Sequence, residues 1–345
     1  MQNLMKIVAI GMIAVAMLAG ANTPVCSAED KLAISIWGGS YAERFKEHVV
    51  KGFEAKYNVR VVVEGGRSSE RLSKLIATKG RGIDLFYITD NQMLEAKRRG
   101  VLQPVNADNI PNMNLLYDFA RDPLGDSIGP AFTILGVGLA YNRDHFSAPP
   151  DSWTDLKHQD LKAGVAYPGM GVSYGPMMLI LMAEMNGGGI DNVDPGFKTL
   201  QEMKGRLQFF KRSGPTLKSI NQGDVSIAPV LNIFARKDPS APLRFTWPKE
   251  GGIGVRNMAC VVKGTKNAAL AEKFINYHLS TPVQEAMLRK QGETPVNVKV
   301  EVPNDLPFTI LEKSDIRRLH FWDLVKIADA RANWISRWQE EVVAE

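Results

Sequence analysis

The chain has 345 residues, of which 45% are hydrophobic, and its 42 basic and 37 acidic side chains give a net charge of +5. The basic residues are scattered along the chain instead of gathered into long runs, which argues against a nucleic-acid-binding protein. A chain of this length exceeds what one hydrophobic core usually serves, so we expect two lobes or domains.

The first 28 residues predict a secretory signal peptide. Lys6 provides a short cationic start, the segment 7–21 carries no charge, and the segment 26–28 consists of small residues. The apolar run is too short for an ordinary membrane-spanning helix of about 20 residues. We expect cleavage after Ala28 and a periplasmic mature protein. Lipid attachment to Cys26 is the alternative, although the two residues before it suit lipoprotein processing poorly.

Cysteine content excludes a disulfide framework. After cleavage Cys260 is the only cysteine, so no intramolecular disulfide can form and the core alone must hold the fold. Lys6 is the only charged residue of the leader, so the mature chain keeps 41 basic and 37 acidic side chains. No second apolar run reaches the length of a membrane span.

Strand and helix patterns alternate along the first third of the mature chain. Short apolar or β-branched runs predict strands at 31–37, 59–64 and 83–88. A turn rich in glycine or hydroxyl residues follows each run, and then a stripe of apolar residues at helical spacing. Strands that alternate with helices predict a mostly parallel sheet with right-handed crossovers.

The rest of the chain predicts a second lobe. A long β-like run at 131–142 lies between prolines and is suited to carry the chain from one lobe to the other, and 229–234 is a second candidate crossing. Further strands are expected at 164–167, 225–230 and 252–263. Helices are expected at 174–185, 197–212 and 268–279, from Thr281 onward with proline in its first turn, and in the Trp-rich tail 314–343.

Three predicted corners between strand and helix carry small or hydroxyl residues. Ligands of open α/β sheets bind beyond the carboxyl ends of the strands, where helix N-termini present free amides. These corners supply candidate ligand contacts at Trp37, Gly38, Gly39, Ser40, Arg67, Thr89 and Asp90. Ordinary helix capping is the alternative, because Ser40 with Glu43 resembles a capping box, as does the segment 89–92. Trp37 ends a strand at such a corner and suits a core position or a ligand platform equally well.

The segment 171–175 (GVSYG) matches the G-x-S-x-G nucleophile elbow of serine hydrolases. Five residues separate the preceding strand from Ser173, which is too loose for an elbow, and nothing resembles an oxyanion segment. The preferred interpretation is a fourth helix start that faces the cleft, with Ser173 and Tyr174 available for hydrogen bonds. A secreted serine hydrolase that uses Ser173 remains the alternative function.

Metal and cofactor signatures are absent from the sequence. The five histidines show no metal-ligand spacing, and neither a P-loop nor a G-x-G-x-x-G segment follows a strand. We therefore expect no catalytic residue, no metal and no cofactor.

Several segments resemble extracellular solute-binding proteins of the spermidine/putrescine-binding type. No single segment is diagnostic, but their order and spacing are specific, and the resemblance covers nearly all of 31–339. The matching segments are 35–41 (SIWGGSY), 136–143 (GVGLAYNR), 152–156 (SWTDL), 248–252 (PKEGG), 263–267 (KGTKN), 274–277 (FINY), 282–284 (PVQ) and 295–297 (PVN).

The resemblance implies a type II periplasmic binding fold, in which two α/β lobes joined by two hinge crossings close around a solute. On this basis we expect a monomer that serves an inner-membrane ABC permease, or a solute sensor on the same fold. The expected division is residues 29–134 with 236–302 for lobe 1, 135–235 for lobe 2, and 303–345 for C-terminal helices that pack on the lobes.

The resemblance does not carry over to the ligand. Polyamine binders of this family hold a dicationic chain with aromatics and carboxylates, whereas this sequence has Val255, Arg256 and Asn257 after the PKEGG segment and Leu231 before Asn232 at the hinge. A desolvated ammonium needs an opposite charge or several acceptors. We therefore expect an amine, amino-acid-like or carboxylate- or phosphonate-bearing solute, with a lean toward an anionic end, and Arg67, Arg256, Asn232 and Asn257 among the contacts.

Overall fold

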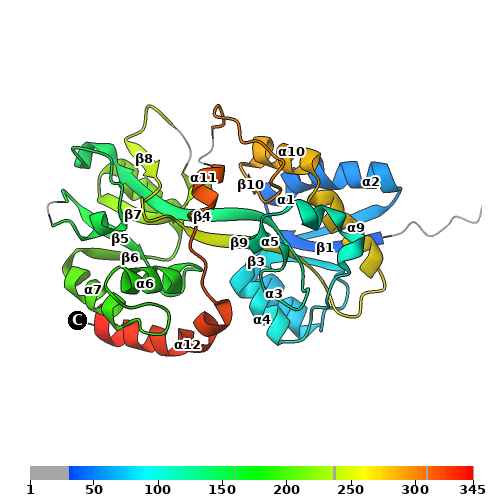
Figure 1. The fold of residues 1–345 in the computed structure, drawn as a ribbon, viewed down its shortest axis with the longest axis horizontal. Coiled ribbons are helices and arrows are strands. Elements are labelled where there is room, and N and C mark those ends of the chain that lie inside the picture. The colour runs from blue at the N-terminus through cyan, green and yellow to red at the C-terminus, as the bar shows by residue number, and fades with distance from the viewer. Residues whose placement is uncertain (1–30, 160, 236–237, 308–309, 345) are drawn as a thin grey trace, which may run out of the picture.

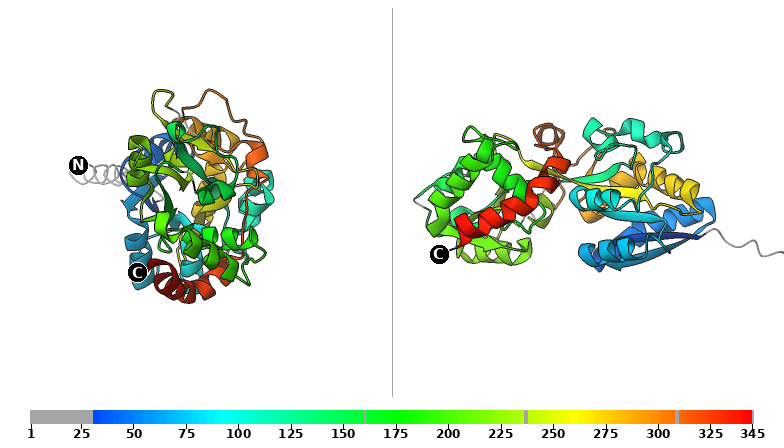
Figure 2. Two further views of the ribbon diagram at one scale, coloured as in Figure 1. Left: turned by 90° about the vertical axis from the view of Figure 1, so that its left-hand side faces the viewer. Right: turned by 90° about the horizontal axis from the view of Figure 1, so that it is seen from below.

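Two lobes lie side by side and are joined by two long strands, β4 (Ala131–Asn142) and β9 (Ile253–Val261) (Figure 1). The computed structural model describes residues 31–159, 161–235, 238–307 and 310–344, so the predicted signal peptide lies outside the described residues. The predicted two-lobed α/β fold is confirmed. Figure 2 shows the two lobes as separate groups of helices around a narrow waist.

The strands form one ladder in the order β2-β1-β3-β9-β4-β7-β5-β6, with β8 and β10 also paired to β4. The strands other than β4 and β9 are β1 (Lys31–Trp37), β2 (Arg60–Gly66), β3 (Leu85–Thr89), β5 (Gly164–Pro168), β6 (Leu207–Phe210), β7 (Val225–Leu231), β8 (Leu243–Thr246) and β10 (Thr294–Pro295).

The α-helices pack on both faces of this sheet. They are α1 (Ser40–Phe45), α2 (Lys51–Tyr57), α3 (Ser68–Ala77), α4 (Asp90–Arg98), α5 (Asp118–Arg121), α6 (Gly175–Glu184), α7 (Asp194–Met203), α8 (Ser213–Gln222), α9 (Ala268–His278), α10 (Thr281–Gln291), α11 (Lys313–Ile316) and α12 (Leu324–Arg337). A π-helical stretch (Lys46–Val50) joins α1 to α2. No helix in the described ranges is long and apolar enough to cross a membrane.

Lobe 1 is built around the parallel strands β1, β2 and β3, with β9 antiparallel to β3. One face of the sheet packs against α1, α2 and α9 through Phe45, Phe53 and Phe274. The other face packs against α3 and α4 through Leu75 and Met93. Because the three parallel strands run the same way, their carboxyl ends meet at one edge, which lies toward lobe 2 (Figure 1).

Lobe 2 is built around β5, which is parallel to β6 and β7, while β7 is antiparallel to β4. Helix α6 is apolar on all sides and almost wholly buried, as such helices are in larger cores. The C-terminal helix α12 packs on this lobe through Trp334. Arg98 of α4 in lobe 1 reaches across to Asp329 of α12, with 2.7 Å between Nη2 and Oδ1.

The crossing strands meet where neither has a side chain. Gly136 of β4 lies opposite Gly254 of β9. A Cβ atom on Gly136 would lie 2.7 Å from the ring of Trp247, and one on Gly254 would lie 2.2 Å from the ring of Phe321. Glycine at both positions therefore lets aromatic rings pack directly on the hinge backbone.

The structure contradicts two of the predicted elements. The predicted single helix at 197–212 is wrong, because α7 ends at Met203 and the chain continues as β6, which pairs with β5. The helical stripe seemed to continue, but sheet pairing overrides local propensity here. The predicted crossing at 229–234 is also wrong. That segment ends β7 inside lobe 2, and β9 is the second strand between the lobes.

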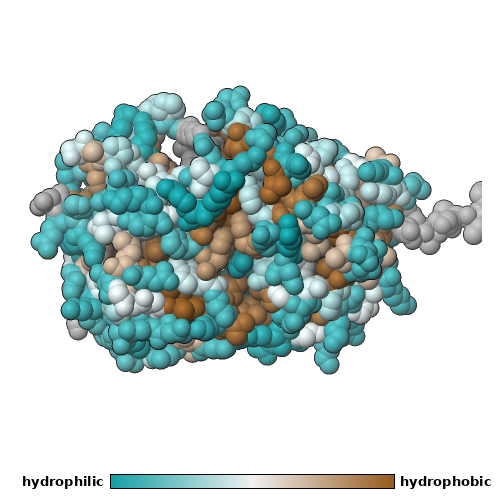
Figure 3. Space-filling view, in the orientation of Figure 1, coloured by the Kyte–Doolittle hydropathy of each residue, from teal (hydrophilic) through white to brown (hydrophobic). Residues whose placement is uncertain are grey.

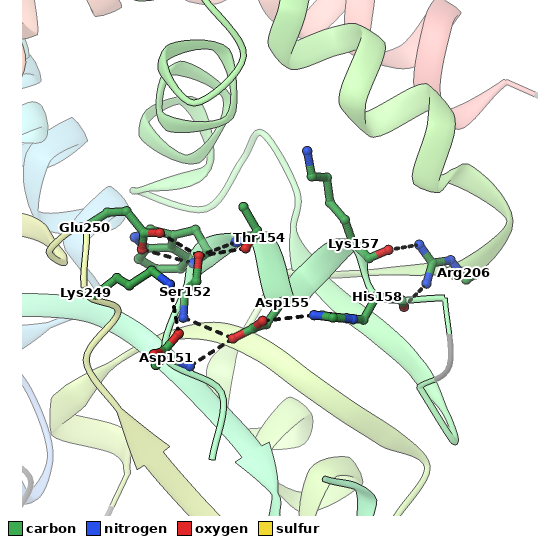
Figure 4. A network of polar contacts seen from close by, with 10 residues as sticks. Asp151, Ser152, Thr154, Asp155, Lys157, His158, Arg206, Lys249 and Glu250 are labelled. Carbon is green, nitrogen blue, oxygen red and sulfur yellow. Dashed lines mark hydrogen bonds and ion pairs between the residues drawn. The ribbon is translucent and has the colours of Figure 1, made fainter. Parts of the chain in front are cut away.

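A network of polar contacts joins the segment immediately before β9 to lobe 2 (Figure 4). Glu250 accepts hydrogen bonds from Ser152 Oγ at 2.5 Å and from the backbone nitrogen of Trp153 at 3.3 Å. The indole nitrogen of Trp153 donates to the oxygen of Gly251 at 2.8 Å. Two of the segments that carry the family resemblance, 152–156 and 248–252, therefore serve to hold the fold together.

We predict that Glu250→Ala destabilises the protein by about 1–3 kcal/mol, because Ser152 loses an acceptor inside a partly buried network. Lys249→Ala is the matched control, since its ion pair with Asp151 is solvent-exposed and worth about 0–1 kcal/mol. Urea unfolding of both variants measures the difference. Equal losses in the two variants would contradict a structural role for this network.

Candidate functional site

The candidate site lies where the carboxyl edge of lobe 1 meets lobe 2. Trp37 ends β1, Gly66 ends β2, and Thr89 ends β3, immediately before α4. Asn91 of α4 reaches the loop before α6, where its Nδ2 donates to the backbone oxygen of Ser173 at 3.4 Å. The two lobes thus touch at this edge. Figure 3, in the orientation of Figure 1, shows hydrophobic residues gathered near the middle of the molecule, with hydrophilic ones around them.

The corner after β1 is shaped by glycine. A Cβ atom on Gly65 would lie 2.9 Å from the Cα of Gly38, so the turns after β1 and β2 can approach only without side chains. Trp37 is half-buried there, donates from Nε1 to Ser68 Oγ at 2.9 Å, and contacts Tyr41 edge-to-face at 5.3 Å. Its ring thus bridges the starts of α1 and α3.

The predicted capping boxes at Ser40 and Thr89 are wrong. The N-cap of α1 is Gly39, whose φ of +65° favours glycine, and Ser40 is already helical and exposed. Thr89 is the N-cap of α4, but its hydroxyl contacts the side chains of Asn91 and Gln92 instead of a backbone amide. The hydroxyls are therefore not committed to capping, and their predicted contact with ligand stays a prediction.

Asp90 and Arg256 form a buried ion pair. The distance from Arg256 Nε to Asp90 Oδ2 is 2.8 Å, and Asp90 is 0% exposed. The guanidinium also lies over the ring of Phe321, 4.8 Å from its centre. The two opposite charges compensate each other, so neither residue offers a lone charge to a ligand.

Three other side chains that were predicted to contact the ligand either form hydrogen bonds within the protein or face solvent. The hydroxyl of Tyr174 is buried and donates to the backbone oxygen of Pro229 at 3.3 Å. The side-chain oxygen of Asn232 accepts from the backbone nitrogen of Gly136 at 3.0 Å, which ties β7 to the crossing strand. The side chain of Arg67 is 83% exposed and lies 3.7 Å from Glu70.

Asn257 is the predicted contact with the most unusual surroundings. It lies on β9 opposite Thr89 of β3 and Thr133 of β4, so the three side chains form a row on one face of the sheet. Its Oδ1 atom is buried and has no hydrogen-bond partner among the described residues. An unpaired buried acceptor costs about 1–3 kcal/mol, which makes this row a place that favours a donor group.

Sequence reasoning missed Arg71, whose charge is buried at the edge of lobe 1. Arg71 is 3% exposed, and its Nε donates to the oxygen of Gly66 at the end of β2. Its Nη1 donates to Ser35 Oγ and to the oxygen of Tyr87. Nη2 has no partner in the described part of the chain, and no carboxylate lies within ion-pair distance there. Burial lowers the pKa of Arg71 to about 10, so it remains charged at neutral pH.

Glu293 was also missed, although it stands two residues before the matching 295–297 segment. It is 3% exposed, and Tyr41 and Gln291 both donate to its Oε1, at 2.6 and 3.0 Å. Its Oε2 is buried without a partner among the described residues. Burial raises the pKa of this carboxyl group, while the Tyr41 hydrogen bond lowers it. Position in the family pattern was the only available signal, since the partner Tyr41 is 252 residues away.

Ser173 lacks the surroundings of a catalytic nucleophile in the described chain. Its backbone meets Asn91, but its hydroxyl is joined to no histidine. His278 lies in the core of lobe 1 beside Tyr87, and burial lowers its pKa to about 3. His320 contacts the oxygen of Glu250 near the hinge. Across the described ranges, no group of three or more His, Cys, Asp or Glu side chains is placed to hold a metal ion.

Comparison with known proteins identifies the family. Residues 81–317 match the family described as bacterial extracellular solute-binding protein. The chain belongs to this family.

Similar proteins are named for the solutes that they bind. The chain is 22% identical to spermidine/putrescine-binding periplasmic protein 1 of Haemophilus influenzae over 325 residues, which cover 92% of this chain and 86% of that protein. It is 24% identical to the gamma-aminobutyric acid-binding protein of Pseudomonas aeruginosa over 184 residues, which cover 49% and 50%.

Solved structures share the fold. An ABC transporter protein of Clostridium perfringens superposes with a TM-score of 0.82 at 24% identity, over 90% of this chain and 99% of that one. The periplasmic binding protein AfuA of Actinobacillus pleuropneumoniae, with fructose-6-phosphate bound, gives 0.70 at 21% identity, over 92% and 99%. These likenesses confirm the periplasmic binding protein fold.

The family decides the broad function. Its members are described as extracellular solute-binding proteins, and one structural neighbour is the substrate-binding protein of a spermidine/putrescine ABC transporter. This chain is accordingly an extracellular solute-binding protein by family, and the alternative of a secreted hydrolase finds no support.

We predict that Asp90→Ala lowers the free energy of unfolding by about 3–5 kcal/mol, because it leaves the charge of Arg256 buried and unpaired. The double variant Asp90→Ala with Arg256→Met should recover much of this loss. Asp118→Ala, which breaks an exposed pair with Arg121, is the control and should cost about 0–1 kcal/mol. Chemical denaturation measures all three. An Asp90→Ala loss no larger than the control would refute a buried pair.

Proposed function

We propose that this protein captures a small polar solute with an anionic group between its two lobes, and that closure of the lobes holds it for delivery to the permease. The anionic group is a carboxylate or a phosphonate. It binds at the carboxyl edge of lobe 1, beside the corner formed by Trp37 and Gly38.

The observation that carries this proposal is the buried guanidinium of Arg71, which forms no ion pair among the described residues and leaves Nη2 without a partner there. Buried charges are usually paired, because desolvation of a lone ion costs several kcal/mol. The guanidinium lies under the ring of Trp37, 5.6 Å from its centre, at the edge where ligands of such sheets bind. An arriving anion would supply the missing partner for Nη2 and recover part of the cost of burial.

The surroundings of Arg71 support an anion over a polyamine. Helix α3 begins at Ser68, beside Trp37, and its N-terminal amides favour negative charge. Asp90 is the one acid at the end of β3, and Arg256 already neutralises it. The relatives named for polyamines bind cations, which this arrangement disfavours. The neighbour with bound fructose-6-phosphate shows that the fold also accommodates a phosphate group.

Closure is supported by two contacts between the lobes. Asn91 meets the backbone of Ser173 at the candidate site, and Arg98 meets Asp329 of α12. The first contact is a single hydrogen bond of 3.4 Å and the second is partly exposed, so both can break and form at small cost. A solute that binds both lobes would shift the population toward the closed state.

We predict that a carboxylate- or phosphonate-bearing solute raises the melting temperature of the wild-type protein and changes its tryptophan fluorescence. Binding at 100 times the dissociation constant adds about 2.7 kcal/mol of stability. Arg71→Gln should weaken binding of the anion by about 10- to 100-fold, because a charge-assisted hydrogen bond is lost. Titration calorimetry measures the affinity.

Arg121→Gln is the matched control, since this arginine is half-exposed and paired with Asp118 at the surface. It should bind as the wild type does. Arg67→Gln tests whether the exposed arginine at the same edge, instead of Arg71, binds the anion. A loss in Arg67→Gln with none in Arg71→Gln would overturn the assignment to Arg71, and binding of diamines alone would overturn the anionic class.

Absence of catalysis is also part of the proposal. We predict that Ser173→Ala binds solute as the wild type does and that neither protein hydrolyses a nitrophenyl ester above background. Only the backbone oxygen of Ser173 takes part in the contact between the lobes, and alanine retains it. Ester turnover that disappears in Ser173→Ala would show that the protein is an enzyme.

A further inference from the structure

We propose that the end of lobe 1 farthest from lobe 2 binds the anionic headgroups of a phospholipid membrane through a cluster of basic side chains. This inference goes beyond the proposed function, because it concerns neither the cleft nor the solute. The basic cluster consists of six exposed residues, Lys31, Arg60, Lys79, Arg81, Lys263 and Lys266.

The basic cluster lies where the parallel strands of lobe 1 begin. Lys31 opens β1 and Arg60 opens β2, and the two residues pair in the ladder. The segment 79–84 leads into β3, and the segment 263–267 follows the antiparallel strand β9. Because the carboxyl ends of the parallel strands lie toward lobe 2, their amino ends lie at the opposite end of lobe 1 (Figure 1).

Two turns that carry four of these cations enclose a hollow of about 460 Å³. Its lining residues are 79–84 and 263–267. The two turns are joined, since the backbone nitrogen of Val262 donates to the oxygen of Asp84 at 2.9 Å and the Thr265 hydroxyl donates to Asp84 Oδ1. Asn267 Nδ2 donates to the backbone oxygen of Lys31 at 3.0 Å, so the start of β1 lies beside the same hollow.

The positive charges of the basic cluster are not neutralised within the described chain, where none of the six side chains forms an ion pair. The acids beside the strand starts bond to the backbone instead. Asp84 accepts a hydrogen bond from the nitrogen of Ala33 at 2.7 Å. Glu54 accepts one from the nitrogen of Val61 at 2.8 Å. Like charges gathered at one end repel each other, and an anionic surface would relieve that repulsion.

The sequence before Lys31 indicates which anionic surface this end meets. Residues 1–28 predict an apolar leader, and the three residues from Ala28 to Lys31 span about 10 Å at most. While the leader lies in a membrane, this end of lobe 1 therefore lies close to the lipid headgroups. Anionic headgroups attract lysine and arginine within a Debye length, about 10 Å at 0.1 M salt. Glu29 and Asp30 reduce this attraction, but the six basic residues outnumber them.

The lining of the hollow favours lipid headgroups over nucleic acid. Proteins that bind single strands stack the bases on aromatic rings, and none of the described residues that line this hollow is aromatic. A phospholipid surface presents many phosphates at once, so it can neutralise the whole basic cluster. Binding at this end also leaves the carboxyl edge of lobe 1, with the candidate site, open to solute.

The test measures cosedimentation of the mature chain, residues 29–345, with lipid vesicles at about 50 mM salt. Vesicles that contain phosphatidylglycerol should bind the protein, vesicles of phosphatidylcholine alone should not, and about 500 mM salt should release it. A fourfold variant without the cations around the hollow should bind at least about 100-fold more weakly, because each contributes roughly fivefold. It carries Lys79→Gln, Arg81→Gln, Lys263→Gln and Lys266→Gln.

The matched control removes the same number of exposed basic residues from lobe 2 and should bind the vesicles as the wild type does. It carries Lys198→Gln, Lys211→Gln, Arg212→Gln and Lys218→Gln. Melting of each variant checks the fold. Should the fourfold variant fail to fold, Lys79→Gln with Lys266→Gln removes two exposed charges and should weaken binding by about 25-fold.

Three outcomes would overturn the proposed membrane surface. The first is a loss of vesicle binding in the control as large as in the fourfold variant. The second is equal binding to vesicles with and without phosphatidylglycerol. The third is a wild-type protein that binds neither kind of vesicle but melts at a higher temperature with inorganic phosphate, which would assign the hollow to a free anion.

Discussion

Antiparallel pairing of β4 with β9 is the constraint on which the site depends. Because Gly254 has no side chain, the ring of Phe321 lies on the hinge backbone and covers the guanidinium of Arg256. Arg256 in turn fixes Asp90 at the first residue of α4. The next residue, Asn91, makes the contact with lobe 2. The hinge, the ion pair and the contact between the lobes thus form one continuous series of packed groups.

At the same edge, Arg71 and Glu293 are buried, and each has one side-chain atom without a hydrogen-bond partner among the described residues. A core arginine or glutamate normally finds an opposite charge, because the alternative costs several kcal/mol. Here Arg71 packs against the ring of Trp37, and Glu293 accepts a hydrogen bond from Tyr41, whose ring also contacts Trp37. Hydrogen bonds orient both side chains. Preorganised groups of this kind lose little entropy when a ligand arrives, which favours tight binding of a small molecule.

The sequence allowed the strands and the corners of this site to be predicted, but not its charges. Continuous apolar runs predicted β1 and β4 at their observed bounds, because a strand buried on both faces is apolar along its length. Strand β6 was mistaken for helix, since only its pairing with β5 makes it a strand. The pair between Asp90 and Arg256 joins residues 166 apart, and only the register of β3 with β9 brings them together. Local sequence patterns therefore do not predict which residues of two distant strands lie opposite each other.

The lobes differ in what they can contribute to binding. Among the described residues, Arg71 and Glu293, each with one atom that lacks a hydrogen-bond partner, belong to lobe 1. The predicted contacts in lobe 2 already have partners, since Tyr174 donates to Pro229 and Asn232 accepts from Gly136. On the proposed function, lobe 1 would select the solute by charge, and lobe 2 would enclose it. Enclosure excludes water, and the attraction between fixed charges rises as the surrounding dielectric falls. Closure would then strengthen contacts already made on lobe 1, which explains how a lobe with few free polar groups can still tighten binding.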